Sequence, residues 1–477
     1  MMQESLLAVI STINAYMFDY ILIFLLVSVG LWYSFQTRFV QVRCFFEGVR
    51  NILRGMSFSG EKQAVGITSF RAFLNAVGAQ VGTGNIVGAS GAILIGGPGA
   101  IFWMWVIAFL GMATMYAETV CALSTRKVDA DGTVRGGPVY YILEAFKGRS
   151  GKFLAALFAA STIVSAGLSN FMVQSNSLAS TLNVTFGISN WVTGFFLTVV
   201  CGFILKGSID RMSAFTEKLV PIMSYLFIGG AVAVLIARIQ YVPDALYMIF
   251  YYAFEPQAII GGSFGEALKI AVSQGAKRGL FSNEAGKGSI PHAHVQANVR
   301  NPHAQGVVAM LGVFFDTFVV LTLNALVIIS TMYTADGLLA NGYKGDVTDT
   351  INAANLAQTA FGSVLDPNAF DGFGAQFVAL CLCLFALSTI LVTYTFGKMN
   401  IVYLFGDKAD RAYFILILLF IFAGTLGDSA LVWEVNDLSN GFMVFPNVFA
   451  LIVLTDRVKS ACRGLKKVSL LKRKEVR

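Results

Sequence analysis

Long apolar runs follow one another along most of the 477-residue chain. A helix needs about 20 mostly apolar residues to cross the hydrocarbon of a bilayer. We therefore predict an all-α membrane protein with about 11 transmembrane helices, near residues 14–35, 67–95, 99–123, 153–181, 190–206, 213–237, 262–289, 305–333, 374–397, 411–426 and 430–455. A soluble fold is excluded, because a composition of 56% hydrophobic and 13% charged residues leaves too little polar surface to cover it.

The basic residues predict how these helices are oriented. If the N-terminus lies outside, the inner segments contain all of the 34 Lys and Arg residues except Arg238, Lys269 and Lys344. Because Lys and Arg are concentrated on the cytoplasmic side, we predict a multi-pass protein of the bacterial inner membrane with a cytoplasmic basic tail at 456–477. This distribution explains the net charge of +7 through topology and contact with membrane lipid, so no nucleic-acid partner is expected. The aromatic segment 239–261 is expected to lie on the outer surface.

Two of the predicted helices are interrupted at their middle by Gly and polar residues. The second contains Val81–Gly88 and the seventh contains Gly279–Gly286, and both include the pattern Asn-x-x-Gly. Helices five places apart run in opposite directions, and paired interrupted helices of inverted repeats surround the binding site of secondary transporters. The glycines alone could serve only close helix packing. The polar residues beside them are costly at this depth and therefore favour a binding site.

Interrupted helices suit a particular kind of ligand. The N-terminus of a half-helix presents free N–H groups to a carboxylate. Unwound carbonyl groups and the C-terminus of a half-helix suit a small hard cation such as sodium. We therefore expect a zwitterionic amino acid and a cation to bind together.

Several motifs resemble those of the alanine or glycine:cation symporter family, the sodium:alanine symporters. They are Val81–Gly88, Gly96–Trp105, Met172–Ser177, Arg278–Gly286, Ser289–His294, Asp437, Asn440 and Pro446–Asn447. The resemblance covers nearly the whole chain and implies the leucine-transporter-like fold of the amino acid–polyamine–cation superfamily. Residues 1–477 would form one domain, with an extra N-terminal helix (14–35) before two inverted five-helix repeats (67–237 and 262–455). It also implies sodium-coupled import of alanine or glycine by alternating access.

The expected substrate site combines residues from both interruptions with two residues that the resemblance adds from the fourth helix. The set is Gln80, Thr83, Gly84, Asn85, Gln174, Asn176, Phe281, Ser282, Asn283, Glu284 and Thr393. Amides near Gly84 would bind the substrate carboxylate, and oxygens near Ser282 would bind the amine. Two alternatives remain open: the polar side chains at the first interruption cap the half-helix, and Asn176 joins two helices by a hydrogen bond.

The resemblance also implies a sodium site, formed by the hydroxyls of Ser388 and Thr389 with carbonyls near Gly78 and Val81. Hard oxygen ligands are what such a cation prefers. The alternative is that each hydroxyl bonds to its own helix.

Two acidic residues within the predicted helices leave several roles open. Glu284 could orient the amine, bind a cation, carry a proton or cap the interrupted helix, and Asp316 is a similar case. A third, Glu118, is expected near an inner helix end, paired with Arg126 or another basic residue.

One position departs from the family pattern. The ninth helix contains Thr393 where the family usually has a bulky aromatic residue. A larger pocket would admit glutamine or serine. The remaining alternatives are proton-coupled transport, with Glu284 or Asp316 as the carrier, and an ion channel. We find no nucleophile–base pair, phosphate-binding loop or metal motif, so neither an enzyme nor a cofactor is predicted, and sodium enters only as the coupling ion.

Overall fold

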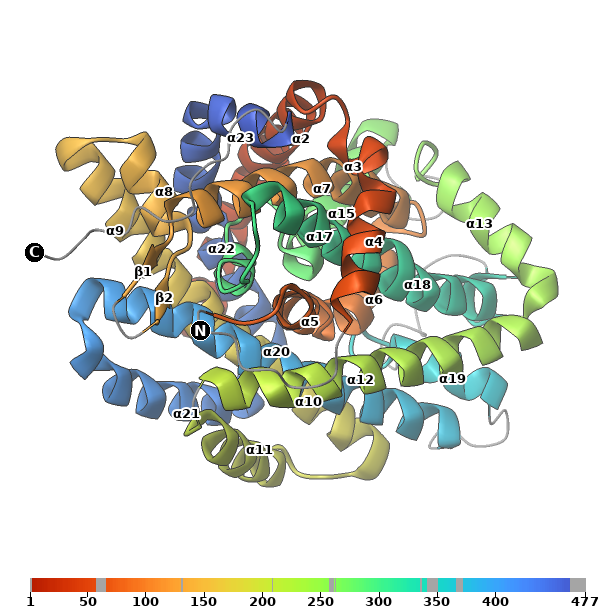
Figure 1. Ribbon diagram of the computed structural model, residues 1–477. Coiled ribbons are helices and arrows are strands. Elements are labelled where there is room, and N and C mark those ends of the chain that lie inside the picture. Colours follow the sequence, from red (N-terminus) through yellow and green to blue (C-terminus); the bar gives the residue numbers. More distant parts are fainter. Residues whose placement is uncertain are drawn as a thin grey trace, which may run out of the picture.

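The computed structural model describes residues 2–56, 66–129, 132–207, 209–256, 261, 263–334, 337–340, 351–365 and 372–463. Parts of the predicted outer segments 239–261 and 334–373, and most of the tail 456–477, lie outside these ranges. The described chain is a bundle of helices with one small hairpin (Figure 1).

The long helical segments correspond to the predicted membrane spans. In chain order they are α1–η1–α2 (Met2–Tyr16, Met17–Leu22, Ile23–Gln36), α5 (Ser69–Gln80) with η2–α6 (Gly84–Gly88, Ala89–Gly96), α7 (Ala100–Thr125), α9–η3–α10 (Gly148–Val164, Ser165–Ser169, Asn170–Phe186), α11 (Asn190–Leu205), α12 (Ile209–Ala237), α15 (Phe264–Asn283) with α16 (Pro291–His294), α17–η5–α18–η6 (Pro302–Val313, Phe314–Leu321, Thr322–Ile328, Ile329–Tyr333), α20 (Phe373–Phe405), α21 (Asp410–Leu426) and α22 (Ser429–Val453). Segments η1, η2, η3, η5 and η6 are π-helical.

Shorter elements connect these segments. They are α3 (Val40–Arg43), α4 (Phe45–Gly55), β1 (Lys127–Val128), β2 (Val134–Arg135), α8 (Pro138–Ala145), η4 (Ile239–Tyr241), α13 (Val242–Tyr251), α19 (Leu356–Leu365), η8 (Asp407–Ala409) and α23 (Thr455–Cys462). Strands β1 and β2 pair antiparallel, with Lys127 opposite Arg135. Figure 1 shows this hairpin on the opposite side of the molecule from α13 and α19.

The outer surface of the bundle is rich in large apolar side chains, and its interior contains polar side chains among the apolar ones. Large apolar residues such as Trp191, Phe195 and Phe203 are exposed along α11, whereas Asn85 and Asp316 are completely buried. Water would penalise an exposed apolar surface of this extent, and a bilayer does not. In the described residues, seven helices are long and apolar enough to cross a membrane, and eight if α22 and α23, bent by 64°, count as one.

Helices at equivalent places of the two predicted repeats pack against each other. The pairs are α7 with α17, α10 with α20, α11 with α21, and η2–α6 with α15. The pair α11 and α21 lies at the lower edge of Figure 1. Two inverted repeats related by an axis in the membrane plane would produce this pairing. The number of eleven helices and the 5+5 repeat stay predictions.

The structure also differs from expectation at three basic residues. Lys277, Arg278 and Lys287 were counted with the inner segments, but Lys277 and Lys287 are buried and Arg278 forms an ion pair with buried Asp437. These three residues belong to the interior of the bundle, so they cannot be counted as evidence for which side of the membrane a loop lies on. A further difference is α19, a helix that the apolar pattern did not predict within the loop 334–373.

Candidate functional site

The predicted interruption of the second helix is confirmed. Helix α5 ends at Gln80, and Val81 adopts an extended conformation (φ −75°, ψ 91°) before the chain resumes as η2. The amide of Gly82 donates to Asn85 Oδ1 at 2.9 Å, and that of Thr83 donates to Gln174 Oε1 at 3.2 Å. Two N–H groups at the start of the second half-helix thus bond to side-chain oxygens. The bond to Asn85 is the capping role that the sequence left open, whereas Gln174 reaches the site from α10.

The interruption of the seventh helix is confirmed as well. Helix α15 ends at Asn283, and Glu284 follows in the left-handed region with φ 59°. Gly286 and Gly288 also have positive φ values, 95° and 83°. Only glycine adopts such angles without steric cost, so these two positions explain why the helix unwinds here.

The two interruptions touch each other. Gln80 Nε2 donates to the carbonyl oxygen of Asn283 at 2.7 Å. Gly84 packs so closely on α15 that a Cβ atom built there would lie 2.8 Å from Cδ1 of Phe281 and 3.2 Å from Cα of Ser282. Residues 203 positions apart in the chain, Gln80 and Asn283, therefore meet in one region, as the five-place offset of the motifs predicts.

Asp316, on η5, lies at the centre of this region. Its carboxylate accepts hydrogen bonds from Asn85 Nδ2 at 2.7 Å, from Ser282 Oγ at 3.0 Å and from Thr317 Oγ1 at 2.9 Å. Within the part of the chain that the structure describes, no basic side chain forms an ion pair with it. A buried carboxylate that is hydrogen-bonded to both interruptions but lacks a cation is a candidate cation or amine site.

The expected sodium ligands also come together in part. Ser388 Oγ and Thr389 Oγ1 lie 3.0 Å and 3.2 Å from the carbonyl oxygen of Gly78, near the end of α5. A Cβ atom at Gly82 would lie 2.6 Å from Thr389 Oγ1, so glycine is needed for this approach. Three oxygens thus converge between α5 and α20. No such contact is recorded for the carbonyl of Val81 among the described residues.

Three other residues of the predicted site contribute no oxygen to the group formed by Gly78, Ser388 and Thr389. Thr393 is buried one turn beyond Thr389 and donates to the carbonyl of Thr389 at 2.7 Å. Asn176 donates to the carbonyls of Gly424 and Gly427, at 3.0 Å and 2.8 Å, and so joins α10 to the end of α21. This is the helix–helix hydrogen bond that was left open. Glu284 forms an ion pair with Lys287 at 2.7 Å.

The expected pairing of Glu118 with Arg126 is wrong. Glu118 Oε1 accepts from Asn447 Nδ2 at 2.5 Å, deep in the bundle. The guanidinium of Arg126 instead donates to the carbonyls of Val295 and Ala297. The prediction assumed a partner close in sequence, Arg126. In the folded protein the partner is instead the amide of Asn447 on α22.

Two further polar residues of the site region were not among the predicted site residues, although Asn440 was noted as part of a family motif. Asn324 Nδ2 donates to the carbonyl of Asn85 at 2.9 Å and so satisfies unwound backbone. Asn440, on α22, accepts from Lys287 Nζ at 3.1 Å and from Ser165 Oγ at 2.5 Å. An amide in an otherwise apolar helix was the available signal for both, since such groups are rare at membrane depth.

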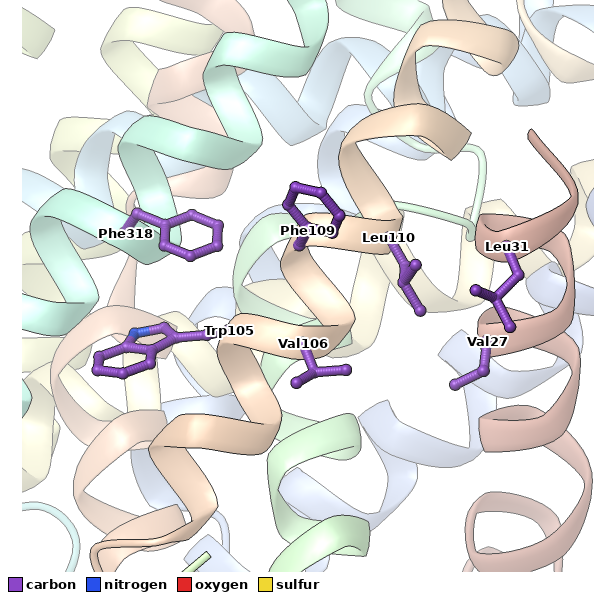
Figure 2. A pocket seen from close by; sticks show the side chains of 7 residues that line it. All are labelled: Val27, Leu31, Trp105, Val106, Phe109, Leu110 and Phe318. Carbon is purple, nitrogen blue, oxygen red and sulfur yellow. The ribbon is translucent and has the colours of Figure 1, made fainter. Parts of the chain in front are cut away.

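An apolar groove lies elsewhere on the molecule. It is lined by side chains of α2, α7 and η5, namely Val27, Leu31, Trp105, Val106, Phe109, Leu110 and Phe318 (Figure 2). Its one polar atom, the indole nitrogen of Trp105, already donates to Thr322 Oγ1 at 2.8 Å. A zwitterion would lose its hydration there without replacement, so this groove is not a substrate site.

Comparisons with known proteins agree with the geometry. The sodium:alanine symporter family matches residues 3–475. The chain is 36% identical to the putative sodium/proton-dependent alanine carrier protein YrbD of Bacillus subtilis, over 93% of this chain and 89% of that protein. It is 34% identical to the sodium/alanine symporter AgcS of Methanococcus maripaludis, over 97% of both chains.

Two further similarities concern the substrate range and the fold. The probable sodium/glutamine symporter GlnT of Bacillus subtilis is 34% identical, over 97% of this chain and 91% of that protein. The crystal structure of MhsT in complex with L-phenylalanine superposes with a TM-score of 0.59 at 14% identity, over 86% of this chain and 98% of MhsT. The chain therefore belongs to the sodium:alanine symporter family, and it is a transporter with the leucine-transporter-like fold and not an enzyme.

Proposed function

We propose that this protein is a sodium-coupled symporter that imports a small neutral amino acid, alanine or glycine above all, by alternating access. The observation that carries the proposal is the contact between the two interrupted helices, where Gln80 Nε2 meets the carbonyl of Asn283 at 2.7 Å. The names of the relatives AgcS and YrbD, both of which include alanine, support the substrate class. Family membership sets aside the ion-channel alternative.

The substrate carboxylate binds at the start of the second half-helix in this mechanism. In the structure, Gln174 Oε1 accepts a hydrogen bond from the amide of Thr83. A substrate carboxylate oxygen is an acceptor of the same kind and is negatively charged. Substrate binding replaces this side chain, because a charged acceptor gains more from a half-helix N-terminus than an amide oxygen does. The amine then lies toward Ser282 and Asp316, which present oxygen atoms from α15 and η5.

Sodium binds between α5 and α20, at the carbonyl of Gly78 and the hydroxyls of Ser388 and Thr389. These groups are neutral, so a bound sodium brings a positive charge into the membrane. The membrane potential acts on that charge with about 2.3 kcal/mol per 100 mV, which corresponds to roughly 50-fold accumulation of substrate for one cation.

A second candidate is proton coupling through Asp316. Asp316 is completely buried and forms no ion pair with a described basic residue, and intramembrane carboxylates of this kind serve as proton carriers in transporters. The name of the relative YrbD includes both sodium and proton. Uptake of labelled alanine into proteoliposomes distinguishes the two. Replacement of sodium by choline at fixed pH abolishes uptake if sodium is the coupling ion, and unchanged uptake would reject sodium coupling.

The preferred amino acid is tested by competition. All twenty amino acids are offered against labelled alanine in proteoliposomes, with and without a sodium gradient. We expect alanine and glycine to compete best. Strong competition by glutamine with weak competition by glycine would instead favour glutamine or serine selectivity, for which Thr393 and the name of the relative GlnT are the supporting observations.

We place the protein in the bacterial inner membrane, with an outer N-terminus and a cytoplasmic tail at 456–477. The groove of Figure 2 suits a lipid acyl chain, because all of its lining side chains are apolar or aromatic. The basic residues of the tail suit anionic headgroups.

A further inference from the structure

A lysine side chain is buried inside the interrupted seventh helix. Lys287 lies in the unwound segment between α15 and α16, and it is among the largest fully buried side chains of the protein. Its ammonium lies 2.7 Å from Glu284 Oε1 and 3.1 Å from Asn440 Oδ1. The side chains of this ion pair are only 2% and 3% exposed.

The oxygen atoms around this ammonium resemble a site for a free cation. One is a carboxylate oxygen of the unwound segment and one is an amide oxygen of α22, and both are hard ligands of the kind that alkali cations use. The second carboxylate oxygen of Glu284 accepts from Ser289 Oγ at 2.6 Å, and Asn440 Oδ1 also accepts from Ser165 Oγ. The hydroxyls therefore fix the orientation of both ligands independently of the lysine.

Other ionisable side chains lie near this ion pair. Glu118 on α7 and Asp316 on η5 lie near Glu284, and Asp437 on α22 lies near Lys287. Asp437 has its own partner in Arg278 at 3.4 Å. On the inner side, His292 of α16 bonds through Nδ1 to the carbonyl of Ser289 at 2.8 Å, and its Nε2 meets Asn400. Among the described residues, Lys287 is the cation in ion-pair contact with Glu284.

We propose that the Lys287 ammonium is a tethered counter-cation that occupies a monovalent-cation site formed by Glu284 and Asn440. The proposal rests on cation-coupled symport as the function. It concerns the number of cations carried in each transport cycle, because a site filled by Lys287 carries no free cation. The ammonium of Lys287 takes the place of a free cation and cannot leave the site, because it is covalently attached to the chain. Removal of the lysine side chain opens the site, and the vacated carboxylate then takes up sodium or a proton.

The test uses the purified full chain with Lys287→Met, in a Ser388→Ala/Thr389→Val background that removes the other expected sodium site. Melting temperature is measured in sodium chloride and in choline chloride at equal ionic strength, at several pH values. We expect the variant to melt at a higher temperature in sodium than in choline, or at acidic than at neutral pH. The first result identifies sodium and the second a proton. The same background with Lys287 retained lacks this added dependence, and whatever dependence it shows through Asp316 is the baseline for the comparison.

The matched control is the double substitution Glu284→Gln/Lys287→Met in the same background. It removes both charges and is expected to lose the cation and pH dependence. A melting temperature of the Lys287→Met variant that depends neither on the choice of sodium or choline nor on pH would overturn the proposal. Failure of that variant to fold under every cation and pH condition would overturn it too, since a free cation should then have replaced the lysine.

Measuring alanine uptake tests whether the same site affects the number of cations used in each transport cycle. Lys287→Met in the otherwise unchanged chain is expected to raise the Hill coefficient for sodium, or for protons, by about one in alanine uptake, and Glu284→Gln/Lys287→Met is not. An unaltered coefficient with retained uptake speaks against the proposal alone. Absence of any sodium or proton dependence in the unsubstituted protein speaks against the proposed function itself.

Discussion

Gly84 provides a direct test of the contact between the two interrupted helices. A methyl group at this position would lie 2.8 Å from Cδ1 and 3.0 Å from Cε1 of Phe281, and 3.2 Å from Cα of Ser282. The ring can turn slightly, but the backbone of α15 cannot move without lengthening the bond from Gln80 to Asn283. We therefore predict that Gly84→Ala separates the interruptions and impairs transport.

The magnitude follows from two opposing effects. Inserting a methyl group into a packed interior costs about 1–3 kcal/mol, and replacing glycine by alanine in a helix recovers about 0.5–1 kcal/mol. The net cost is about 0–2.5 kcal/mol, with a middle value of about 1.3 kcal/mol. It falls on the arrangement in which the two interruptions meet, which transport requires. Since about 1.4 kcal/mol corresponds to a factor of ten, we expect roughly 10-fold slower uptake of labelled alanine into proteoliposomes under a sodium gradient.

Gly91, seven residues later on α6, is the matched control. A Cβ atom there would lie 3.5 Å from Cβ of Ala353, which is an ordinary contact. Gly91→Ala should therefore transport at the wild-type rate and melt at the same or a slightly higher temperature. If Gly84→Ala transports as well as Gly91→Ala, the two interruptions do not need their observed separation, and the proposed site is in the wrong place.

Three further substitutions separate the parts of the site. Ser388→Ala/Thr389→Val should raise the sodium concentration for half-maximal uptake at least 10-fold, because each ligand to a charge contributes about 1.5–3 kcal/mol. The control Thr395→Val, whose hydroxyl bonds within α20, should leave that concentration unchanged. Equal effects of the two variants would argue against a cation at this site. Asp316→Asn should reduce uptake more than 10-fold or alter its cation or pH dependence, and uptake with unchanged rate and dependence would remove this carboxylate from the mechanism. Asn176→Ala should lower the melting temperature, because the buried carbonyl of Gly427 loses its donor at a cost of about 1–3 kcal/mol, whereas that of Gly424 keeps the Gly427 amide, and half-saturating alanine should stay constant. Weaker alanine affinity with unchanged melting would instead place Asn176 at the substrate.

The features that the sequence predicted well are those with a local signal. Glycine and asparagine in the middle of an apolar run signal unwound backbone, and both interruptions occur where Gly82 and Gly286 lie. The pairing of Ser388 and Thr389 with Gly78 was available through the family resemblance and not through the residues alone.

The features that it missed depend on contacts between distant segments. Lys287 is preceded and followed by glycine, and a lysine in that context is typical of a loop, whereas the fold buries it against α22. A helix–helix hydrogen bond of Asn176 was one of the alternatives from the sequence, but its acceptors, the carbonyls at the end of α21, could not be identified. The central position of Asp316 depends on η5 lying between two segments that are remote in the chain, which no local pattern contains.

The π-helical segments have a consequence for movement. Four of them contain buried polar residues, among them Asn85 in η2, Ser165 in η3, Asp316 in η5 and Ser330 in η6. Such a segment holds one residue more than an α-helix of the same rise, and absorbing that residue into regular i→i−4 bonding turns everything beyond it by roughly 100°. Each of these helices can thus redirect a polar side chain by a local change of register, without unfolding and without tilting the whole helix through the lipid.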